Sequence, residues 1–340
     1  MERSRLSVRL HGGIDPRRAL ELAACAEANG FASLWFAENP FGRGALPAAA
    51  ACAAATRRIG IGIGVLNPYN RHPTLIAMEI GALDQLAQGR VRLGIGAGIA
   101  SATERMGLRA DRSLSAVRDA IRIVRAMLAG DEVNYAGKAF SAIKVKLDYE
   151  PLRPDLALLM AARGEQALAL CGRIADGLII SNMCPLEFTR HAVDTMRGSA
   201  LAAGRRPPAE VVQYIPCAAR RDRGEAHQLA KAALGEMLLG FWSLGQRVPA
   251  AKAALLQAQD LSEEDFSRAS ERLRAGDTDA LDARFVSAFA IAGTAQDCLA
   301  QARRYFDAGA TELALSFAGP QPEDDMNYLG AVMQEEPQPA

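Results

Sequence analysis

Hydrophobic and polar positions follow one repeated unit along the chain. A short run of β-branched or aliphatic residues leads into a Gly, Asn or Asp turn, and an Ala/Leu/Arg-rich stretch with helical spacing comes next. This unit recurs from end to end and predicts parallel β/α architecture. The predicted strands are Leu6–His11, Ala32–Phe36, Arg58–Leu66, Val91–Ala97, Leu156–Ala161, Asp176–Ser181, Val211–Ala218 and Glu312–Ser316. Eight such strands are the number that closes a (β/α)8 barrel, the TIM barrel.

Helix signals lie between these strands. Asp15 stands where an N-cap belongs, with Pro16 in the first turn behind it, and Gly89 ends a helix later in the chain. Helices are predicted over Pro16–Ala28, Pro73–Ala87, Ser113–Ala129 and Glu165–Gly172. We expect them to run back along the outside of the barrel.

Two segments interrupt the repeat. Residues 130–155 carry Gly and Pro residues around short β-like pieces, and residues 222–310 are too long for one crossover and read as several Ala/Leu-rich helices. We interpret both as insertions on a single barrel domain over residues 1–335, the second being a helical excursion after strand seven. A short helix is expected after strand eight, and residues 336–340 are expected to form a frayed tail.

Composition narrows the possible partners and compartment. The chain has 39 basic and 39 acidic residues, so no net field attracts nucleic acid or an anionic membrane. It contains no apolar run of about 20 residues, and its first ten residues, MERSRLSVRL, lack the apolar core of a signal peptide. A cytoplasmic protein is therefore expected. The six cysteines are scattered without a CxxC pair, which argues against a zinc site or a disulfide framework, and we expect no metal.

Two strands alternate glycine with other residues. Residues 59–65 read IGIGIGV and residues 93–98 read LGIGAG. A dinucleotide-binding turn needs GxGxxG between a strand and a helix, whereas these glycines lie within the strands themselves. Glycine inside a strand marks a close approach of backbone or ligand. The glycines either leave room for a flat ligand at the mouth of the barrel or admit bulky neighbours inside it.

Polar residues follow two of the predicted strands. Glu38 and Asn39 come directly after strand two, where barrel enzymes keep functional groups, although a loop or helix-capping role is the alternative. The loop from Asn67 to Pro73 gathers an aromatic ring, a guanidinium, an imidazole and two amides. This mixture suits a polar ligand with a conjugated face, and a rigid connector between two prolines is the alternative.

Two later turns are candidate phosphate or backbone-approach sites. Residues 160–166, MAARGEQ, pass through Gly164 into a helix start, whose free N–H groups suit a phosphate, and Arg163 adds charge. Gly177 and Leu178 offer a second close approach of the backbone, although turns of both kinds are ordinary turn chemistry more often than not. No Ser/His/Asp triad is legible, which favours chemistry performed by a cofactor.

The segment from Asn67 to Gly98, NPYNRHPTLIAMEIGALDQLAQGRVRLGIGAG, resembles the luciferase-like flavin and deazaflavin oxidoreductases. Within that superfamily the chain looks most like the methylenetetrahydromethanopterin reductases, which use the deazaflavin coenzyme F420. The likeness extends to Gly30–Asn39, Ala161–Gly164, Ile174–Asn182 and Phe289–Leu315.

The resemblance implies a barrel with an excursion after strand seven, a homodimer or larger homo-oligomer, and a set of site residues. A non-proline cis peptide at Gly64-Val65 would form a bulge against the back of the cofactor ring. Glu38 would lie near the deazaflavin ring, and Asn67 would contact it. The remaining residues assigned to the cofactor are Ala97 and Gly98 at the next strand end, Ala162, Arg163 and Gly164 at the phosphate, and Gly177 and Leu178.

Two departures from the family pattern bear on catalysis. Asn39 stands where deazaflavin members often have His, and Arg9 stands where the methanopterin reductases carry Glu. Glu38, Asn39 and Arg9 are therefore the catalytic candidates, with Arg9 unable to handle a proton as that Glu would.

The leading hypothesis is a coenzyme F420-dependent oxidoreductase that passes hydride between the deazaflavin and a small organic substrate, such as a pterin- or folate-linked one-carbon unit. The first alternative is an FMN-dependent monooxygenase that receives reduced flavin from a separate flavin reductase. The second alternative is a flavin-binding protein without catalytic activity.

Overall fold

The computed structural model of the protein describes residues 5–335. Eight parallel strands form a ring that closes where β8 pairs with β9. The barrel strands are β1 (Leu6–Leu10), β2 (Ser33–Phe36), β3 (Gly60–Leu66), β4 (Val91–Ile95), β7 (Leu158–Ala161), β8 (Gly177–Ile180), β9 (Glu210–Ala219) and β11 (Glu312–Phe317). The predicted TIM barrel is confirmed, and every strand end lies within two residues of its predicted position.

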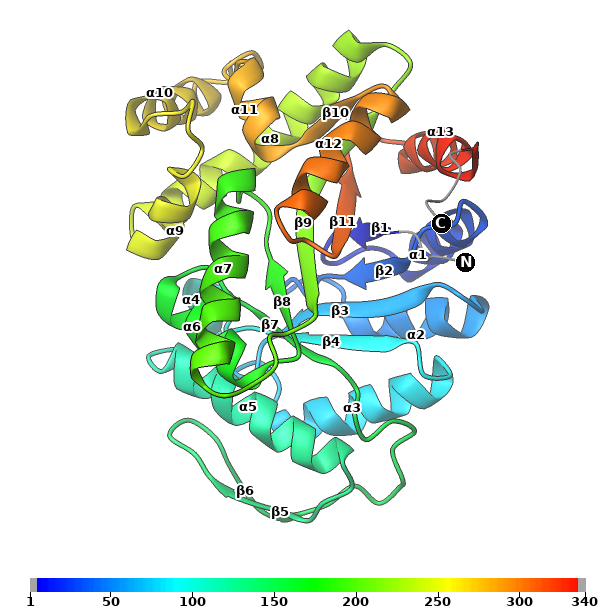
Figure 1. The fold of residues 1–340 in the computed structure, drawn as a ribbon, viewed down its shortest axis with the longest axis vertical. Helices are drawn as coiled ribbons and strands as arrows, with labels where there is room; N and C mark the ends of the chain where they lie inside the picture. Colours follow the sequence, from blue (N-terminus) through cyan, green and yellow to red (C-terminus); the bar gives the residue numbers. More distant parts are fainter. Residues whose placement is uncertain (1–4, 336–340) are drawn as a thin grey trace.

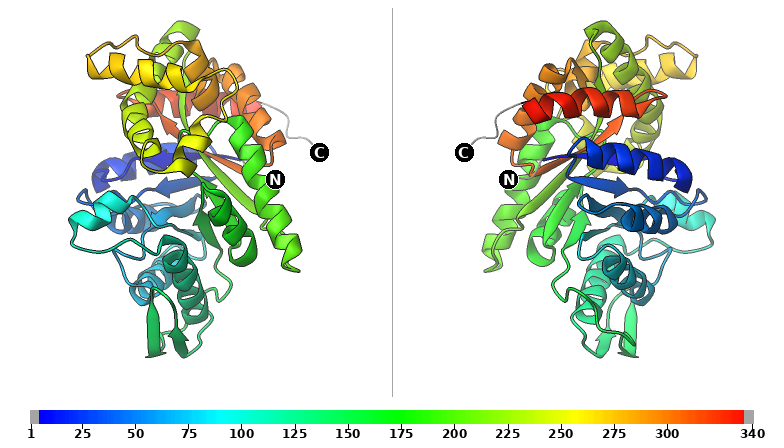
Figure 2. Two further views of the ribbon diagram at one scale, coloured as in Figure 1. Left: turned by 90° about the vertical axis from the view of Figure 1, so that its left-hand side faces the viewer. Right: turned by 90° about the vertical axis from the view of Figure 1, so that its right-hand side faces the viewer.

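Helices cover the outside of the barrel (Figure 1). They are α1 (Pro16–Ala28), α2 (Ala45–Ala55), α3 (Pro73–Leu86), α5 (Ser113–Leu128), α6 (Glu165–Ile174), α7 (Leu186–Ala202), α12 (Ala295–Asp307) and α13 (Pro322–Glu335). The short helix α4 (Ala100–Arg105) follows β4, and its Thr103 accepts a hydrogen bond from Asn67 of the loop after β3. Asp15 caps α1 as expected, because its carboxylate accepts a hydrogen bond from the Arg17 N–H at 2.9 Å. The helix expected after strand eight is α13, which lies beside α1 (Figure 2). The predicted tail, residues 336–340, lies outside the described residues.

The two interrupting segments contain elements of their own. An antiparallel hairpin of β5 (Val133–Ala136) and β6 (Ser141–Val145) precedes β7. The segment after β9 contains α8 (Arg223–Gly245), α9 (Pro249–Leu255), α10 (Glu263–Arg274), α11 (Ala283–Phe289) and the strand β10 (Ile291–Gly293). β10 pairs with β9 outside the ring. The sequence did not predict this strand, because three residues are too few to show the alternation of hydrophobic and polar positions that marks a strand. The hairpin and these helices lie at opposite ends of the molecule (Figures 1 and 2). The interpretation as one domain stays a prediction.

The base of the barrel is closed by a partly buried ion cluster, in which Glu312 is the most buried member. Arg92 of β4 contacts both Glu312 of β11, with Nη1 2.6 Å from Oε2, and Glu210 of β9, at 3.1 Å. Glu312 also accepts hydrogen bonds from Ser7 Oγ at 2.6 Å and from Trp35 Nε1 at 2.7 Å. Buried charges are costly unless they are paired and hydrogen-bonded. The cluster meets that condition with residues from separate strands.

The structure decides the role of most of the strand glycines. A Cβ atom on Gly62 would collide with the Trp35 ring, one on Gly64 with the Tyr214 hydroxyl and the Trp35 ring, and one on Gly94 with Ile179. These aromatic and aliphatic side chains belong to the apolar filling of the barrel interior. Gly62 and Gly64 of β3 and Gly94 of β4 therefore admit bulky neighbours inside the barrel, rather than leaving room for a ligand.

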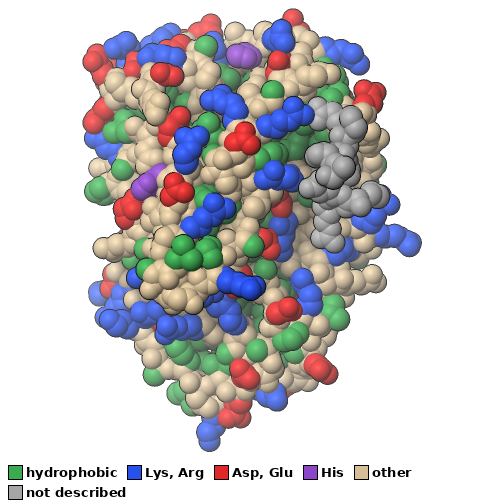
Figure 3. Space-filling view, in the orientation of Figure 1, with side chains coloured by type: hydrophobic (Ala, Val, Ile, Leu, Met, Phe, Trp, Pro, Cys, Tyr) green, Lys and Arg blue, Asp and Glu red, His purple; other side chains and the backbone are tan. Residues whose placement is uncertain are grey.

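Charge of both signs is spread over the surface. Figure 3 shows Lys and Arg side chains interspersed with Asp and Glu across the visible face. Within residues 5–335, no helix combines the length and the apolar character that crossing a membrane requires.

Candidate active site

A cavity of about 280 Å³, which we call the mouth cavity, opens beyond the C-terminal ends of strands β1 to β4. Residues that follow successive parallel strands meet at one end of a barrel, which is why segments distant in sequence share this wall. Six of the predicted site residues line it: Arg9, Glu38, Asn39, Val65, Asn67 and Gly98.

The end of β3 forms one wall of the mouth cavity. The non-proline cis peptide that the resemblance implied is confirmed at Gly64-Val65, and the pairing of β3 with β4 shifts its register there. Gly64 is buried, and its carbonyl accepts a hydrogen bond from the Tyr214 hydroxyl at 3.3 Å. Val65 lines the cavity and supplies an apolar surface.

Glu38 is held by an arginine from the next strand's loop. Arg71 Nη1 donates to Glu38 Oε1 at 3.0 Å, and Arg71 Nε lies 2.7 Å from Glu79 Oε2 on α3. The side chain of Glu38 is only 13% exposed, so its pairing with Arg71 offsets much of the cost of burying the carboxylate. Sequence reasoning noted the loop that contains Arg71 but not this contact, because the two residues belong to different strand ends.

Two asparagines of the loop after β3 have different roles. Asn67 is buried; its Nδ2 donates to Thr103 Oγ1 at 3.1 Å, and its Oδ1 accepts from the Tyr69 N–H at 3.0 Å. Gly98 packs against it with a φ of 64°. Asn70, which sequence reasoning did not single out, also lines the mouth cavity, and its Oδ1 is buried without a hydrogen-bond partner among the described residues. Asn67 shapes the loop, whereas Asn70 has a free acceptor.

Arg9 lies at the inner edge of the mouth cavity. Its Nη1 donates to Ser316 Oγ at 3.3 Å, and its guanidinium lies 5.0 Å from the centre of the Tyr214 ring. Its Nε is buried without a hydrogen-bond partner, and no carboxylate of residues 5–335 forms an ion pair with it. Burial lowers the pKa of Arg9, with Tyr214 opposing the shift, yet a guanidinium keeps its charge at neutral pH.

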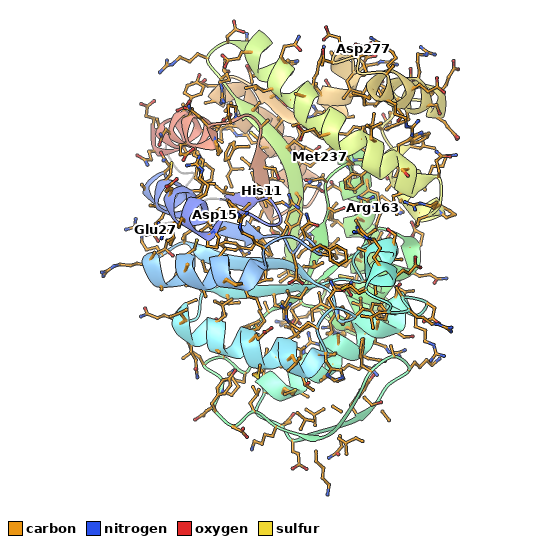
Figure 4. All side chains as sticks on the ribbon, turned by 180° about the vertical axis from the view of Figure 1, so that it is seen from behind. His11, Asp15, Glu27, Arg163, Met237 and Asp277 are labelled. Carbon is orange, nitrogen blue, oxygen red and sulfur yellow. The ribbon has the colours of Figure 1, made fainter. Side chains whose placement is uncertain are left out.

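A second cavity of about 440 Å³, which we call the side cavity, begins at the same arginine. It lies between β1, α1, α8 and the end of β11, and its walls include Val8, Leu10, Leu229 and Met237. His11 and Met237, labelled in Figure 4, are two of its lining residues. Arg9 lines both cavities and stands at their junction.

The predicted phosphate turn lies at the end of β7, outside the lining of the mouth cavity. Ala162 is buried, and Gly164 is the N-cap of α6. Arg163 donates to Ser181 Oγ at 2.5 Å and to the Asn182 carbonyl at 2.8 Å, and its guanidinium lies 4.9 Å from the centre of the Phe241 ring. Figure 4 shows Arg163 well apart from His11. The side chain of Arg163 is therefore engaged within the protein. Ala97 is half-buried against the core beside Gly98.

Gly177 and Leu178 were expected at the cofactor, and the structure corrects this. They form the first residues of β8, where Gly177 pairs with Glu210, and Leu178 is fully buried. All barrel strands are parallel, so the start of β8 lies at the base, at the opposite end from the mouth cavity. A Cβ atom on Gly177 would lie 2.8 Å from Leu159 Cγ, so this glycine serves packing. Among residues 5–335, no three His, Cys, Asp or Glu side chains gather as metal ligands.

Comparison with known proteins places this site in a family context. The family model described as luciferase-like monooxygenase matches residues 3–312. The chain is 27% identical over 314 residues to the 5,10-methylenetetrahydromethanopterin reductase of Archaeoglobus fulgidus, covering 90% of this chain and 91% of that protein. It is 31% identical over 203 residues to the F420-dependent glucose-6-phosphate dehydrogenase of Microbacterium testaceum, covering 56% of this chain and 60% of that protein.

A solved structure shows the same fold. The coenzyme F420-dependent tetrahydromethanopterin reductase of Methanopyrus kandleri superposes with a TM-score of 0.85 at 23% identity, covering 96% of this chain and 97% of that chain. The family match spans most of the described barrel and includes the mouth cavity. The chain therefore belongs to the luciferase-like monooxygenase family and is an oxidoreductase of that family.

Proposed function

We propose that this protein is a coenzyme F420-dependent oxidoreductase that transfers hydride between the deazaflavin and an organic substrate. The observation that supports it most is the mouth cavity, where Val65 provides an apolar face and Glu38 and Asn70 provide polar groups. The names of the Microbacterium relative and of the Methanopyrus structure carry the same cofactor, F420. FMN is the alternative cofactor, because the family is described by its monooxygenases.

The residues present fit a flat heterocycle with hydrogen-bonding edges. Asn70 Oδ1 is a buried acceptor without a partner, and such an atom is costly unless a donor reaches it. A ring N–H of a deazaflavin would be such a donor. The turn at Ala162 to Gly164 stays our proposed phosphate position, with the backbone N–H groups at the start of α6 rather than the Arg163 side chain as the donors.

The cofactor, when bound, supplies the carbon that gives or receives hydride. The protein's own residues position the reactants and manage the proton. Glu38, held by Arg71, faces the cavity with a carboxylate that can accept a proton from a substrate hydroxyl or return it. The Asn39 amide can hydrogen-bond but cannot take a proton, so Glu38 would act alone.

The substrate is proposed to differ from methylenetetrahydromethanopterin. Arg9 occupies the position where the resemblance expects a Glu, and a guanidinium cannot accept a proton there. A pterin- or folate-linked one-carbon unit with another charge distribution stays a candidate substrate. We further propose a homodimer or larger homo-oligomer, as the resemblance implies.

Equilibrium binding of oxidised F420 and of FMN to the purified apo-protein tests the proposal. F420 should bind more tightly than FMN, and Asn70→Ala should weaken F420 binding about 5-fold, because one buried hydrogen bond is worth about 1 kcal/mol. Asn134→Ala, the same change on the distant β5–β6 hairpin, should leave the affinity unchanged. Tighter binding of FMN would favour the monooxygenase with its separate flavin reductase, and binding of neither would overturn both readings.

A further inference from the structure

Arg9 and the side cavity have no part in the hydride chemistry described above. Arg9 is nevertheless a charged side chain placed inside the mouth of the barrel, with a buried Nε that no group of the described protein satisfies. Its side chain donates a long hydrogen bond to Ser316 Oγ at 3.3 Å, and this acceptor is neutral. A buried cation in this state destabilises the fold, so it points to a role outside stability.

The carboxylates around Arg9 are already engaged or remote. Glu38, which shares the mouth cavity with it, is paired with Arg71. Glu312, at the base of the barrel, is paired with Arg92. Glu236 and His11 line the side cavity, but both are exposed to solvent. The positive charge of Arg9 is therefore available to an anion that enters either cavity.

The side cavity adds a second condition on that anion. Its walls next to Arg9 are predominantly apolar, with Val8 and Leu10 from β1, Leu229 and Met237 from α8, and Phe317 from β11. Its volume of about 440 Å³ lies in the range of small-molecule sites. A molecule that satisfies both features has an anionic group at one end and an apolar body behind it.

We propose that Arg9 binds a carboxylate of the substrate at the junction of the two cavities, while the apolar body of the substrate occupies the side cavity. Arginine suits this role because its planar fork matches a carboxylate with two parallel hydrogen bonds. The carboxylate would bind beside Ser316 Oγ and the Tyr214 ring, which keep the guanidinium in place. The inference rests on the proposed function in one respect, since it takes the mouth cavity to be the place of the cofactor ring.

Calorimetric titration with octanoate and with octanamide tests the inference, on apo-protein and on protein loaded with F420. Octanoate should bind more tightly than the neutral amide, and Arg9→Met should weaken octanoate binding about 10- to 100-fold while leaving octanamide binding unchanged. Ala233→Trp, which fills the side cavity from α8, should also weaken octanoate binding. Arg190→Met, on the exposed face of α7, is the matched control and should change neither affinity.

Thermal unfolding separates a binding role from a structural one. If Arg9 serves a ligand, Arg9→Met removes an unpaired buried charge and should raise Tm by about 1–3 °C. A lower Tm together with unchanged octanoate binding would show that Arg9 is a structural residue and would overturn the inference.

Two further outcomes keep the inference distinct from the proposed function. Equal weakening of F420 and octanoate binding in Arg9→Met would assign Arg9 to the cofactor and overturn the substrate assignment, while the proposed function stands. Arg9-dependent octanoate binding in a protein that binds no F420 would support the anion site and contradict the proposed function.

Discussion

Gly64→Ala is the perturbation that tests most directly how the barrel interior supports the active site. Gly64 precedes the Val65 wall of the mouth cavity, and the space where its Cβ would lie is taken by the hydroxyl of Tyr214. Trp35 Cε3 and Tyr214 Cζ would lie 3.0 and 3.1 Å from that Cβ. Both aromatic side chains are buried, and their rings pack with centroids 6.0 Å apart, so neither can move freely.

The magnitude follows from this collision. Overpacking a buried site lowers the free energy of unfolding by about 1–3 kcal/mol. Because the Tyr214 hydroxyl is confined, we expect Gly64→Ala to lose about 3 kcal/mol, the upper end of this range. With an unfolding entropy of about 2 cal/mol/K per residue over 340 residues, that loss lowers Tm by about 4 °C. Tyr214→Phe alone removes one hydrogen bond, to the Gly64 carbonyl, and should cost about 1 kcal/mol.

Urea unfolding of the two single variants and the double variant provides the assay. The double variant should be more stable than Gly64→Ala alone, because removing the hydroxyl removes the tightest of the contacts with the added Cβ. Gly198→Ala, in α7 with no atom within 4 Å of the added Cβ, is the matched control and should stabilise by up to about 1 kcal/mol. A Gly64→Ala protein as stable as the wild type, or no rescue by Tyr214→Phe, would refute the reasoning.

Three further predictions concern stability. Burial alone would raise the pKa of Glu27, but hydrogen bonds from three backbone N–H groups of residues 57–59 outweigh it and lower that pKa. Glu27→Gln should therefore be less stable than wild type at pH 7, with a difference that shrinks as pH falls below about 4.3. Glu312→Gln should cost about 1.5–3 kcal/mol, since Arg92 keeps its ion pair with Glu210 but loses its more buried charged partner. Thr294→Ala should cost about 1 kcal/mol by removing the capping box of α12.

Urea unfolding checks all three, with pH as a variable for the first. A stability difference for Glu27→Gln that stays constant from pH 7 to pH 3 would contradict the assigned hydrogen bonds. Glu132→Gln is the control for Glu312→Gln, because Glu132 is exposed and has no part in the ion cluster. Equal losses of stability in the two variants would show that the ion cluster at the base adds nothing beyond an exposed carboxylate. An unchanged midpoint for Thr294→Ala would mean that the cap adds nothing to the stability of the native state.

The sequence by itself predicted the number, order and ends of the barrel strands. That success has a physical reason, because each signal acts on the residues next to it in the chain. Asp15 caps the helix that follows it, and Gly89 forms the turn that follows the helix before it. The resemblance around Asn67 to Gly98 also placed the Gly64-Val65 cis peptide. The three-residue strand β10 lacked any such local signal.

Contacts between distant segments were decided only by the tertiary structure. The strand glycines left two interpretations open until Trp35 and Tyr214 proved to fill their space. Gly177 proved to be a packing position, because the space for a Cβ atom there is taken by Leu159 and Glu210 from the two neighbouring strands. The unpaired charge of Arg9 depends on the absence of an ion partner from every neighbouring strand of the described barrel, and only the closed ring brings those strands together.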